Sequence, residues 1–162
     1  MDKPKILTSS TKIRFQDCDP FNHLNNGRYI DYFINQREDQ VLDAYGIDIF
    51  SMILKEKKGW VISNTQLAYL VPAYTMEEVS FESQTIAYSK KHLQAEVRMF
   101  NKDKTVLKSV AWISFVHFDL KKNKTTEHSP KFMQLFEDTV LPLAEKSFDE
   151  REKNLRTIKK NS

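Results

Sequence analysis

The chain has 162 residues, of which 40% are hydrophobic and 29% charged, a composition that favours one globular domain and excludes a disordered or collagen-like polymer. The formal net charge is +3, but the first 143 residues carry 19 basic against 18 acidic side chains, which disfavours a nucleic-acid-binding surface. The single cysteine, Cys18, excludes an intramolecular disulfide and a multi-cysteine metal site.

Targeting and membrane signals are absent from the sequence as given. The N-terminal residues have no apolar core of signal-peptide length. The longest nearly apolar run, residues 110–118, is much shorter than the roughly 18 residues needed to cross a bilayer. Together with the single cysteine, this predicts a cytoplasmic protein without a membrane partner. We expect one domain over residues 1–143 and a charged C-terminal tail over residues 144–162.

The N-terminal part predicts a strand, a long loop and a long helix. Residues 11–15 form a short apolar and β-branched run, and polar turn formers follow over residues 16–27. From about residue 26, apolar side chains recur at helical spacing until Gly46, a plausible C-cap. About nineteen residues at ~1.5 Å each give a helix roughly 28 Å long. Residues 49–54 indicate a short second helix.

The middle of the chain favours β-strands. Four segments are rich in β-branched and aromatic residues or alternate apolar with polar side chains: residues 61–71, 79–88, 92–99 and 105–118. Their connections are too short for parallel crossovers, so we expect antiparallel neighbours.

The C-terminal part predicts helices. Ser129 and Pro130 suit an N-cap and a first helical position, and Pro142 should interrupt the helix that they start. Charges alternate over residues 144–162, with few apolar positions between them. We expect a frayed, solvated helix there in preference to a partner-binding helix.

The loop of residues 14–29 concentrates side chains that could do chemistry. It holds two aspartates, one histidine and three asparagines directly before the long helix. A helix N-terminus presents unpaired N–H groups and a partial positive charge, which can stabilise a developing oxyanion. Asp and Asn are also common in turns and at helix N-caps, so the residue types alone leave a purely structural role open.

The same loop resembles a known family. Asp17-Cys18-Asp19-Pro20, followed by His23-Leu24-Asn25-Asn26 and Tyr29, is similar to the signature of hotdog-fold thioesterases of the 4-hydroxybenzoyl-CoA and acyl-carrier-protein thioesterase group. The likeness continues through Tyr69-Leu70-Val71-Pro72, Glu77-Glu78-Val79 and residues 118–120, and covers residues 10–130. It implies an α+β hotdog fold, in which an antiparallel β-sheet wraps around one long central α-helix, here followed by a C-terminal helix. It also implies a homodimer or a dimer of dimers, a homotetramer, with sites at the dimer interface.

The resemblance implies roles for six residues. Asp19 matches the acid that the family uses as nucleophile or general base, and Asp17 matches a supporting position. His23 matches a catalytic histidine of the plant acyl-carrier-protein thioesterases. The backbone N–H near Asn26 matches the donor that polarises the thioester carbonyl, with Asn25 in support. Tyr29 is expected to contact the substrate. Tyr29, Tyr32 and Phe33 are candidates to line an acyl pocket between helix and sheet, although such aromatic side chains more often simply fill a core.

The expected function is acyl-CoA thioesterase activity, which releases a free carboxylic acid and CoA. A thiol with a pKa near 8.5 departs as thiolate without strong acid assistance, so a carboxylate and an oxyanion donor suffice. We expect no metal and no cofactor, with CoA present only as part of the substrate. Two alternatives stay open: an acyl-carrier-protein (acyl-ACP) thioesterase, and a non-catalytic acyl-thioester binding protein.

Other residues invite competing interpretations. A nucleophilic Cys18 is disfavoured because the neighbouring Asp17 and Asp19 should raise its pKa. Arg37 falls within the apolar arc of the long helix, and we expect it to be buried and paired with a carboxylate or backbone carbonyls, in preference to a contact with substrate. CoA phosphates would need cations, and a group on the predicted hairpins could offer them: Lys90, Lys91, Arg98, Lys102 and Lys104. Charged hairpin tips are usually just solvated, so none of these is assigned individually.

Overall fold

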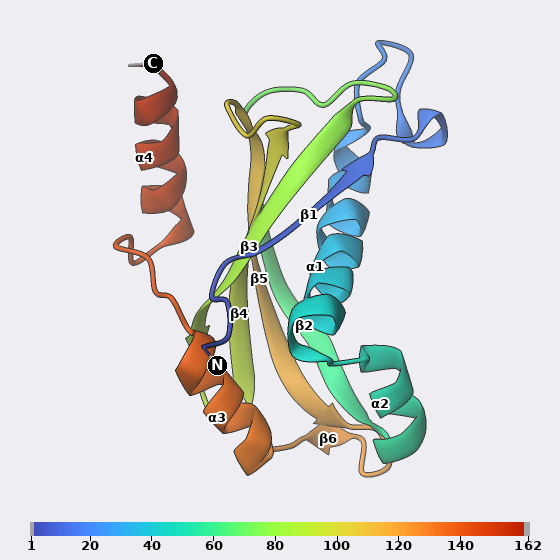
Figure 1. Ribbon diagram of the computed structural model, residues 1–162, viewed down its shortest axis with the longest axis vertical. Helices are drawn as coiled ribbons and strands as arrows, with labels where there is room; N and C mark the ends of the chain where they lie inside the picture. The colour runs from blue at the N-terminus through green and yellow to red at the C-terminus, as the bar shows by residue number, and fades with distance from the viewer. Residues whose placement is uncertain (1, 161–162) are drawn as a thin grey trace.

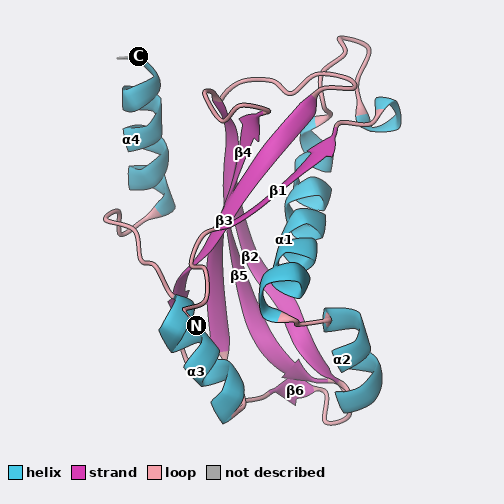
Figure 2. Ribbon diagram, viewed as in Figure 1, coloured by secondary structure: helices cyan, strands magenta, loops and turns pink. Residues whose placement is uncertain are grey.

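A computed structural model describes residues 2–160 and shows a curled antiparallel β-sheet with a long helix against one face (Figures 1 and 2). The strands are β1 (Leu7–Lys12), β2 (Lys58–Tyr69), β3 (Glu78–Tyr88), β4 (His92–Asn101), β5 (Leu107–Asp119) and the short β6 (Lys124–Thr125). The sheet order is β1-β3-β4-β5-β2, with β6 paired to β5, and every pairing is antiparallel. The predicted mixed α+β arrangement is therefore confirmed.

Capping residues define the end of one helix and the start of two others. They are α1 (Tyr29–Tyr45), α2 (Ile49–Glu56), α3 (Pro130–Thr139) and α4 (Phe148–Lys160). Gly46 ends α1 in a left-handed conformation with φ of 69°, and its N–H donates to the Leu42 carbonyl. The Asp48 carboxylate caps α2 by accepting from the Ser51 N–H at 3.0 Å. Ser129 caps α3 in the predicted way, with its hydroxyl accepting from the Phe132 N–H.

The predicted first strand over residues 11–15 is wrong in position. The strand is β1, Leu7–Lys12, and Phe15 lies instead in a single 3-10 turn with 76% of its surface exposed. β1 is an edge strand that pairs only with β3 among the described strands. Its Ser and Thr side chains are exposed or partly exposed, and the strand is held mainly by backbone hydrogen bonds. Its sequence therefore lacks the alternation of apolar and polar residues that would have indicated a strand.

The main core lies between α1 and the sheet. Phe33 of α1 is fully buried and meets Phe81 of β3 edge to face, with ring centroids 5.9 Å apart. Val97, Ala111 and Ile113 complete the sheet side of this cluster together with other apolar residues. The buried stripe of α1 therefore fixes how the helix start is placed against the sheet.

A second cluster covers the opposite face of the sheet, where α4 docks (Figure 1). Phe148 at the start of α4 is 5% exposed and packs edge to face on Trp112 of β5, with centroids 5.7 Å apart. Arg151 makes two hydrogen bonds of 2.8 Å to the buried Glu96 carboxylate. The expected solvated helix over residues 144–162 is thus corrected: the first turn of α4 is packed, and mainly its later residues up to 159 are exposed, while residues 161–162 lie outside the described residues.

Strand β2 ends the sheet with one side unpaired among residues 2–160. It pairs with β5 only, and its apolar Val61 and Ile62 are 43% and 42% exposed. None of the helices in the described part of the chain is long and apolar enough to span a membrane.

Candidate active site

The candidate catalytic loop, residues 14–29, is braced by the connection between β2 and β3. The Leu24 N–H donates to the Ala73 carbonyl at 2.8 Å, and the Thr75 N–H donates to the Asn22 carbonyl at 2.9 Å. The two segments meet beyond the N-terminal end of α1 (Figure 1). These main-chain bonds give the loop a defined shape although it contains little regular structure.

Asp19 is partly buried and has one carboxylate oxygen fixed by the loop. Its Oδ1 accepts from the Phe21 N–H at 2.8 Å and from the His23 N–H at 3.2 Å. The Asp19 N–H in turn donates to the His23 carbonyl at 2.9 Å, which closes the same turn. Within residues 2–160, Oδ2 has no hydrogen-bond donor or cation beside it. The turn-building role therefore occupies one oxygen and leaves the other for a substrate or water.

Asp17 has a different set of contacts from Asp19. Its Oδ2 accepts from the Tyr32 hydroxyl at 2.6 Å, and the same tyrosine oxygen accepts from the Arg14 N–H at 3.0 Å. Burial, followed by the hydrogen bond to Asp17, raises the pKa of Tyr32 to about 12, so this hydroxyl remains a donor at neutral pH. Asp17 thus ties the loop to α1, in line with a supporting position.

The start of α1 presents one backbone donor. A 3-10 turn, Asn26–Arg28, precedes the helix, and the Asn25 Oδ1 caps it by accepting from the Gly27 N–H at 3.0 Å. The Tyr69 hydroxyl donates to the Asn26 carbonyl at 2.9 Å. The Asn26 N–H, the first of the turn, has no acceptor among the residues described. This N–H is a free donor at the positive end of the helix.

His23 lies beside Asp19 in the chain, but its ring packs elsewhere. The ring meets Tyr74 edge to face, with centroids 5.2 Å apart. In the described structure no hydrogen bond joins its imidazole to the Asp19 carboxylate, and only its main chain contacts that group. An imidazole so placed reaches Asp19 only through a bound molecule or water.

Tyr29, Tyr32 and Phe33 belong to the main core cluster, which is the alternative that the sequence left open for these three aromatic rings. Tyr29 is 2% exposed, and its oxygen accepts from the Ala73 N–H at 3.2 Å. Burial raises the pKa of Tyr29, and the bond from Ala73 partly opposes that rise. Tyr29 thus holds Ala73, whose carbonyl is bonded to Leu24 of the candidate catalytic loop.

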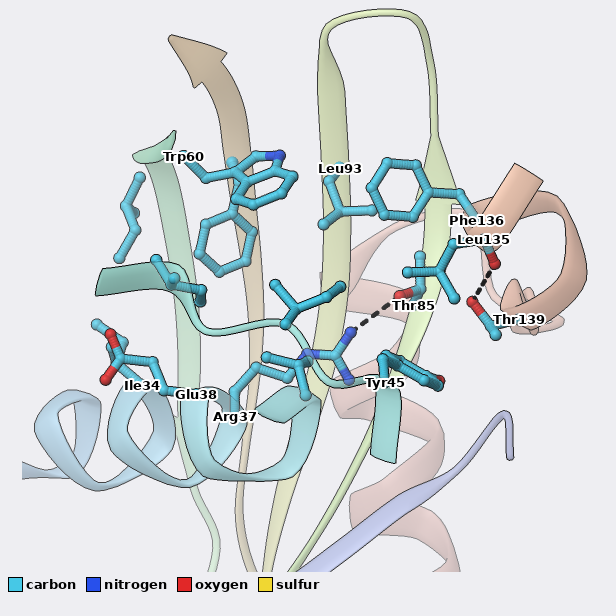
Figure 3. A pocket seen from close by; sticks show the side chains of 15 residues that line it. Ile34, Arg37, Glu38, Tyr45, Trp60, Thr85, Leu93, Leu135, Phe136 and Thr139 are labelled. Atoms are coloured by element: carbon cyan, nitrogen blue, oxygen red, sulfur yellow. Dashed lines mark hydrogen bonds between the residues drawn. The ribbon is translucent and has the colours of Figure 1, made fainter. Parts of the chain in front are cut away.

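An apolar cavity of about 160 Å³ lies farther along α1, toward its C-terminal end (Figure 3). Ile34, Trp60, Leu93 and Phe136 are among its lining residues, and Arg37 extends into it from α1. The sequence offered no signal for this cavity, because its walls come from elements that are distant along the chain.

The partners of Arg37 differ from those expected. Its guanidinium donates to the Ser83 hydroxyl at 2.8 Å and to the Thr85 hydroxyl at 2.9 Å. No carboxylate lies within 4.0 Å of it in the described chain. The predicted burial is confirmed, at 9% exposure, and the predicted carboxylate or backbone partner is wrong.

The cationic group predicted on the hairpins is largely paired on the sheet. Arg98 is buried and contacts Glu96 at 2.6 Å and Glu82 at 3.5 Å. Lys102 and Lys104 each lie within 4.0 Å of a glutamate of β3. Arg98 is thus a structural residue, and it is unsuited to an exposed phosphate.

Two histidines that are distant in the sequence form a ring cluster. His117 and His128 stack with centroids 4.9 Å apart, and the Trp60 indole N–H donates to His128 Nε2 at 3.0 Å. The described residues include no group of three or more His, Cys, Asp or Glu side chains placed to hold a metal ion.

The curled antiparallel sheet around a long helix, with an acidic loop at the helix start, defines a hotdog fold. The sequence profile of the thioesterase-like superfamily matches residues 13–136. The chain belongs to that superfamily. The predicted family and the predicted class, a thioester hydrolase, are therefore confirmed.

Solved structures of low sequence identity share the fold. A DHNA-CoA thioesterase from Staphylococcus aureus is 16% identical, with a TM-score of 0.73 over 82% of this chain and 87% of that one. The probable thioesterase YbaW from Escherichia coli is 22% identical, with a TM-score of 0.69 over 83% and 99%. The hypothetical protein SAV2348 from Staphylococcus aureus, solved in complex with CoA, is 13% identical, with a TM-score of 0.76 over 90% and 91%. A search of curated proteins finds no match.

Proposed function

We propose that the protein is an acyl-CoA thioesterase in which Asp19 supplies the carboxylate and the Asn26 backbone N–H stabilises the oxyanion. The observation that carries this proposal is that the two carboxylate oxygens of Asp19 have different surroundings. Two N–H groups hold Oδ1 in place, and Oδ2 is left unpartnered among the described residues. The same short loop ends at the unpartnered N–H of Asn26.

The reaction needs little more than these groups. Either Asp19 Oδ2 takes a proton from a water that attacks the thioester carbon, or it attacks that carbon itself and water then hydrolyses the resulting anhydride. In both routes the carbonyl oxygen becomes an oxyanion that the Asn26 N–H stabilises. The carbon–sulfur bond breaks, and CoA departs as a thiolate. The products are a carboxylic acid and free CoA.

The other site residues have supporting roles in this proposal. Asp17 holds the loop on α1 through Tyr32, and Asn25 caps the turn that presents the Asn26 N–H. His23 is proposed to orient the attacking water. Its main chain is bonded to the Asp19 carboxylate, but its ring is not, so the ring can bind a water beside that carboxylate. Tyr29 is buried in the main core and stabilises the position of the loop.

CoA is the proposed carrier because a similar fold, SAV2348, has been solved with CoA bound. We propose no further cofactor. An acyl-carrier-protein substrate is the alternative that the His23-Leu24-Asn25-Asn26 run favours. The lone cysteine, which forms no disulfide in this structure, supports a cytoplasmic location.

A homodimer through the free edge of β2 completes the proposal. β2 has an unpaired side in the described structure, and its last residue, Tyr69, bonds directly to the carbonyl of Asn26. A second copy that adds its own β2 to this edge would lie next to the proposed site. A dimer of dimers would then be built on this unit.

Release of free CoA thiol from short, long and aromatic acyl-CoAs tests the function. Asp19→Asn keeps an oxygen that can accept the two loop N–H bonds but removes the base and nucleophile, so we expect turnover to fall by about 100-fold or more. Asp31→Asn is the matched control, since Asp31 is exposed and bonds only Arg28. Full activity in Asp19→Asn would contradict the mechanism.

The same assay separates the alternatives. Thiol release from acyl-ACP, with none from any acyl-CoA, would favour the carrier-protein thioesterase. Stable binding of acyl-CoA or acyl-ACP without thiol release would favour a non-catalytic binding protein.

A further inference from the structure

The apolar cavity beside α1 contains a buried positive charge that its surroundings do not neutralise. The walls are mostly hydrophobic, and at about 160 Å³ the cavity has room for a group about the size of a benzene ring. Arg37 extends from α1 toward these apolar side chains, as Figure 3 shows. An apolar site with one convergent polar group is the usual form of a small-ligand site.

The contacts of Arg37 leave part of its hydrogen-bonding capacity unused. A guanidinium has five N–H donors, and within the described residues Arg37 donates two hydrogen bonds, to the Ser83 and Thr85 hydroxyls. Both acceptors are neutral. Burial lowers the pKa of Arg37 to about 10, the direction expected when no anion compensates the charge. A guanidinium is the side chain best suited to bind a carboxylate with two parallel hydrogen bonds.

The nearest candidate for an internal counter-ion is Glu38, at the mouth of the cavity. Glu38 lines the cavity but is exposed, and its carboxylate forms no ion pair with Arg37. The next residue of the helix points to a different side, so the two side chains diverge from α1. The charge of Arg37 is thus available to a ligand that enters the apolar space.

We propose that this cavity binds a carboxylate carried on an apolar group, with Arg37 as the residue that pairs with the carboxylate. This assignment rests on the proposed thioesterase function: the carboxylate is the far end of the substrate's acyl chain. The preferred substrates are therefore ω-carboxyacyl thioesters. Arg37 is then a specificity-determining residue, and Ser83 and Thr85 orient its guanidinium.

The position of the cavity along α1 fits this role. Eleven residues separate Asn26 from Arg37, which corresponds to about 16 Å at the helical rise of 1.5 Å per residue. Ile30 and Ile34 lie between them on the helix and are both partly exposed apolar side chains packed at the edge of the core. An acyl chain bound with its carbonyl at Asn26 would run along these isoleucines toward Arg37.

Direct binding tests the site without depending on catalysis. Trp60 lines the cavity, so its fluorescence reports occupancy, and titration calorimetry gives the affinity. We expect hexanoate and octanoate to bind the wild-type protein at least tenfold more tightly than hexanol and octanol. Arg37→Met keeps the length and apolar character of the side chain and should remove that difference. Equal binding of acid and alcohol by the wild type would overturn the proposal even if Arg37→Met fails to fold.

Matched substrates identify the source of the carboxylate. We expect dodecanedioyl-CoA and tetradecanedioyl-CoA, whose extended chains are long enough to reach from Asn26 to Arg37, to have a kcat/KM at least tenfold above those of lauroyl-CoA and myristoyl-CoA, and Arg37→Met to lose this preference. Free-acid binding with no such preference would overturn the acyl-end assignment and leave a site for a free carboxylic acid. Free-acid binding with no hydrolysis of any thioester would overturn the proposed function and support the carboxylate site alone.

Glu38→Gln is the control for an internal ion pair. If Arg37 serves external carboxylates, this variant should bind octanoate as tightly as the wild type or more tightly, since one repelling charge is removed. Weaker binding of octanoate together with a loss of thermal stability similar to that of Arg37→Met would assign Glu38 as the counter-ion and overturn the proposal.

Discussion

The Tyr69 hydroxyl, at the end of β2, donates a hydrogen bond of 2.9 Å to the main-chain carbonyl of Asn26, at the start of α1. The Tyr69 ring also packs edge to face on Tyr29, with centroids 5.0 Å apart. The residue that carries the proposed oxyanion donor is therefore positioned by the edge strand of the sheet. Any change in that strand should reach the site through this bond.

Replacement of Tyr69 by Phe tests this coupling. The ring remains, but the bond to the Asn26 carbonyl is lost, so the residue that carries the donor N–H is less well oriented. We expect kcat for acyl-CoA hydrolysis to fall by about tenfold, with a smaller change in KM and a loss of unfolding free energy of about 1 kcal/mol or less. Steady-state kinetics and urea unfolding measure the two effects.

Tyr74→Phe is the matched control for the same loop region. Its ring contacts His23, but its hydroxyl has no hydrogen-bond partner in the part of the chain described. We expect nearly wild-type kcat. Equal losses in the two variants would mean that the Tyr69 bond does not orient the site.

The ion pair between the buried Glu96 of β4 and Arg151 of α4 should hold α4 on the sheet. Glu96 is fully buried, and its carboxylate binds Arg98, Arg151 and the Trp112 indole N–H. Burial raises its pKa, but the bonds and charge of Arg151 and the other donors hold that pKa below its usual value. The carboxylate is therefore ionised and dependent on its partners.

Arg151→Met should uncouple α4 from the sheet. It removes one partner of a buried charge, so we expect a loss of about 3 kcal/mol in unfolding free energy and faster proteolysis within residues 144–160. Lys153→Met is the control, because the Lys153 side chain is exposed on the same helix, forms no ion pair among the described residues and should contribute little. Similar losses in both variants would contradict the anchoring role of Arg151.

The parts of the fold that could be predicted from the sequence are those specified by local patterns. The end of α1 follows from the need for a left-handed residue, which Gly46 supplies, and the start of α3 follows from Ser129. The antiparallel strands follow from short connections. β1 was misplaced because an edge strand made of Ser and Thr needs only backbone partners.

Contacts between distant residues could not be predicted in the same way. Nothing near Arg37 in the sequence indicates that two hydroxyls of β3 accept its hydrogen bonds. Glu96 likewise looks like a solvent-facing strand residue until Arg151 is brought to it from α4. In the candidate site, the motif around Asp19 located the loop, but the supporting bond from Tyr69 depends on sheet order.

The stacked pair of His117 and His128 predicts an acid-sensitive fold. Burial lowers the pKa of both residues, and for His128 the neighbouring His117 lowers it further. In the unfolded chain each would titrate near pH 6.5. Below about that pH the unfolded state binds more protons than the folded state, so stability is full above pH 6.5 and declines as the pH falls toward the lowered folded-state pKa values.

Urea unfolding midpoints between pH 5 and 8 measure this dependence. His117→Phe should flatten the acid side of the profile, because it removes one buried histidine whose Nε2 already lacks a partner among the described residues. His92→Asn is the comparison, since His92 is exposed and its charge is the smallest of the causes that lower the pKa of His128, so this variant should change the profile much less than His117→Phe. An acid profile in His117→Phe as steep as that of the wild type would contradict the assignment.

A substitution on the free edge of β2 should change the assembly of the protein. In the proposed dimer, a second copy would pair along β2, where Val61 is 43% exposed. Val61→Lys places a charge at this edge, which disfavours pairing between two like strands. We expect light scattering to show a lower mass than for the wild type, together with lower thiol release because Tyr69 lies on the same strand. Ser10→Lys adds the same charge to β1, the opposite edge, and should leave mass and activity unchanged. A dimer that persists in Val61→Lys but dissociates in Ser10→Lys would place the interface at β1.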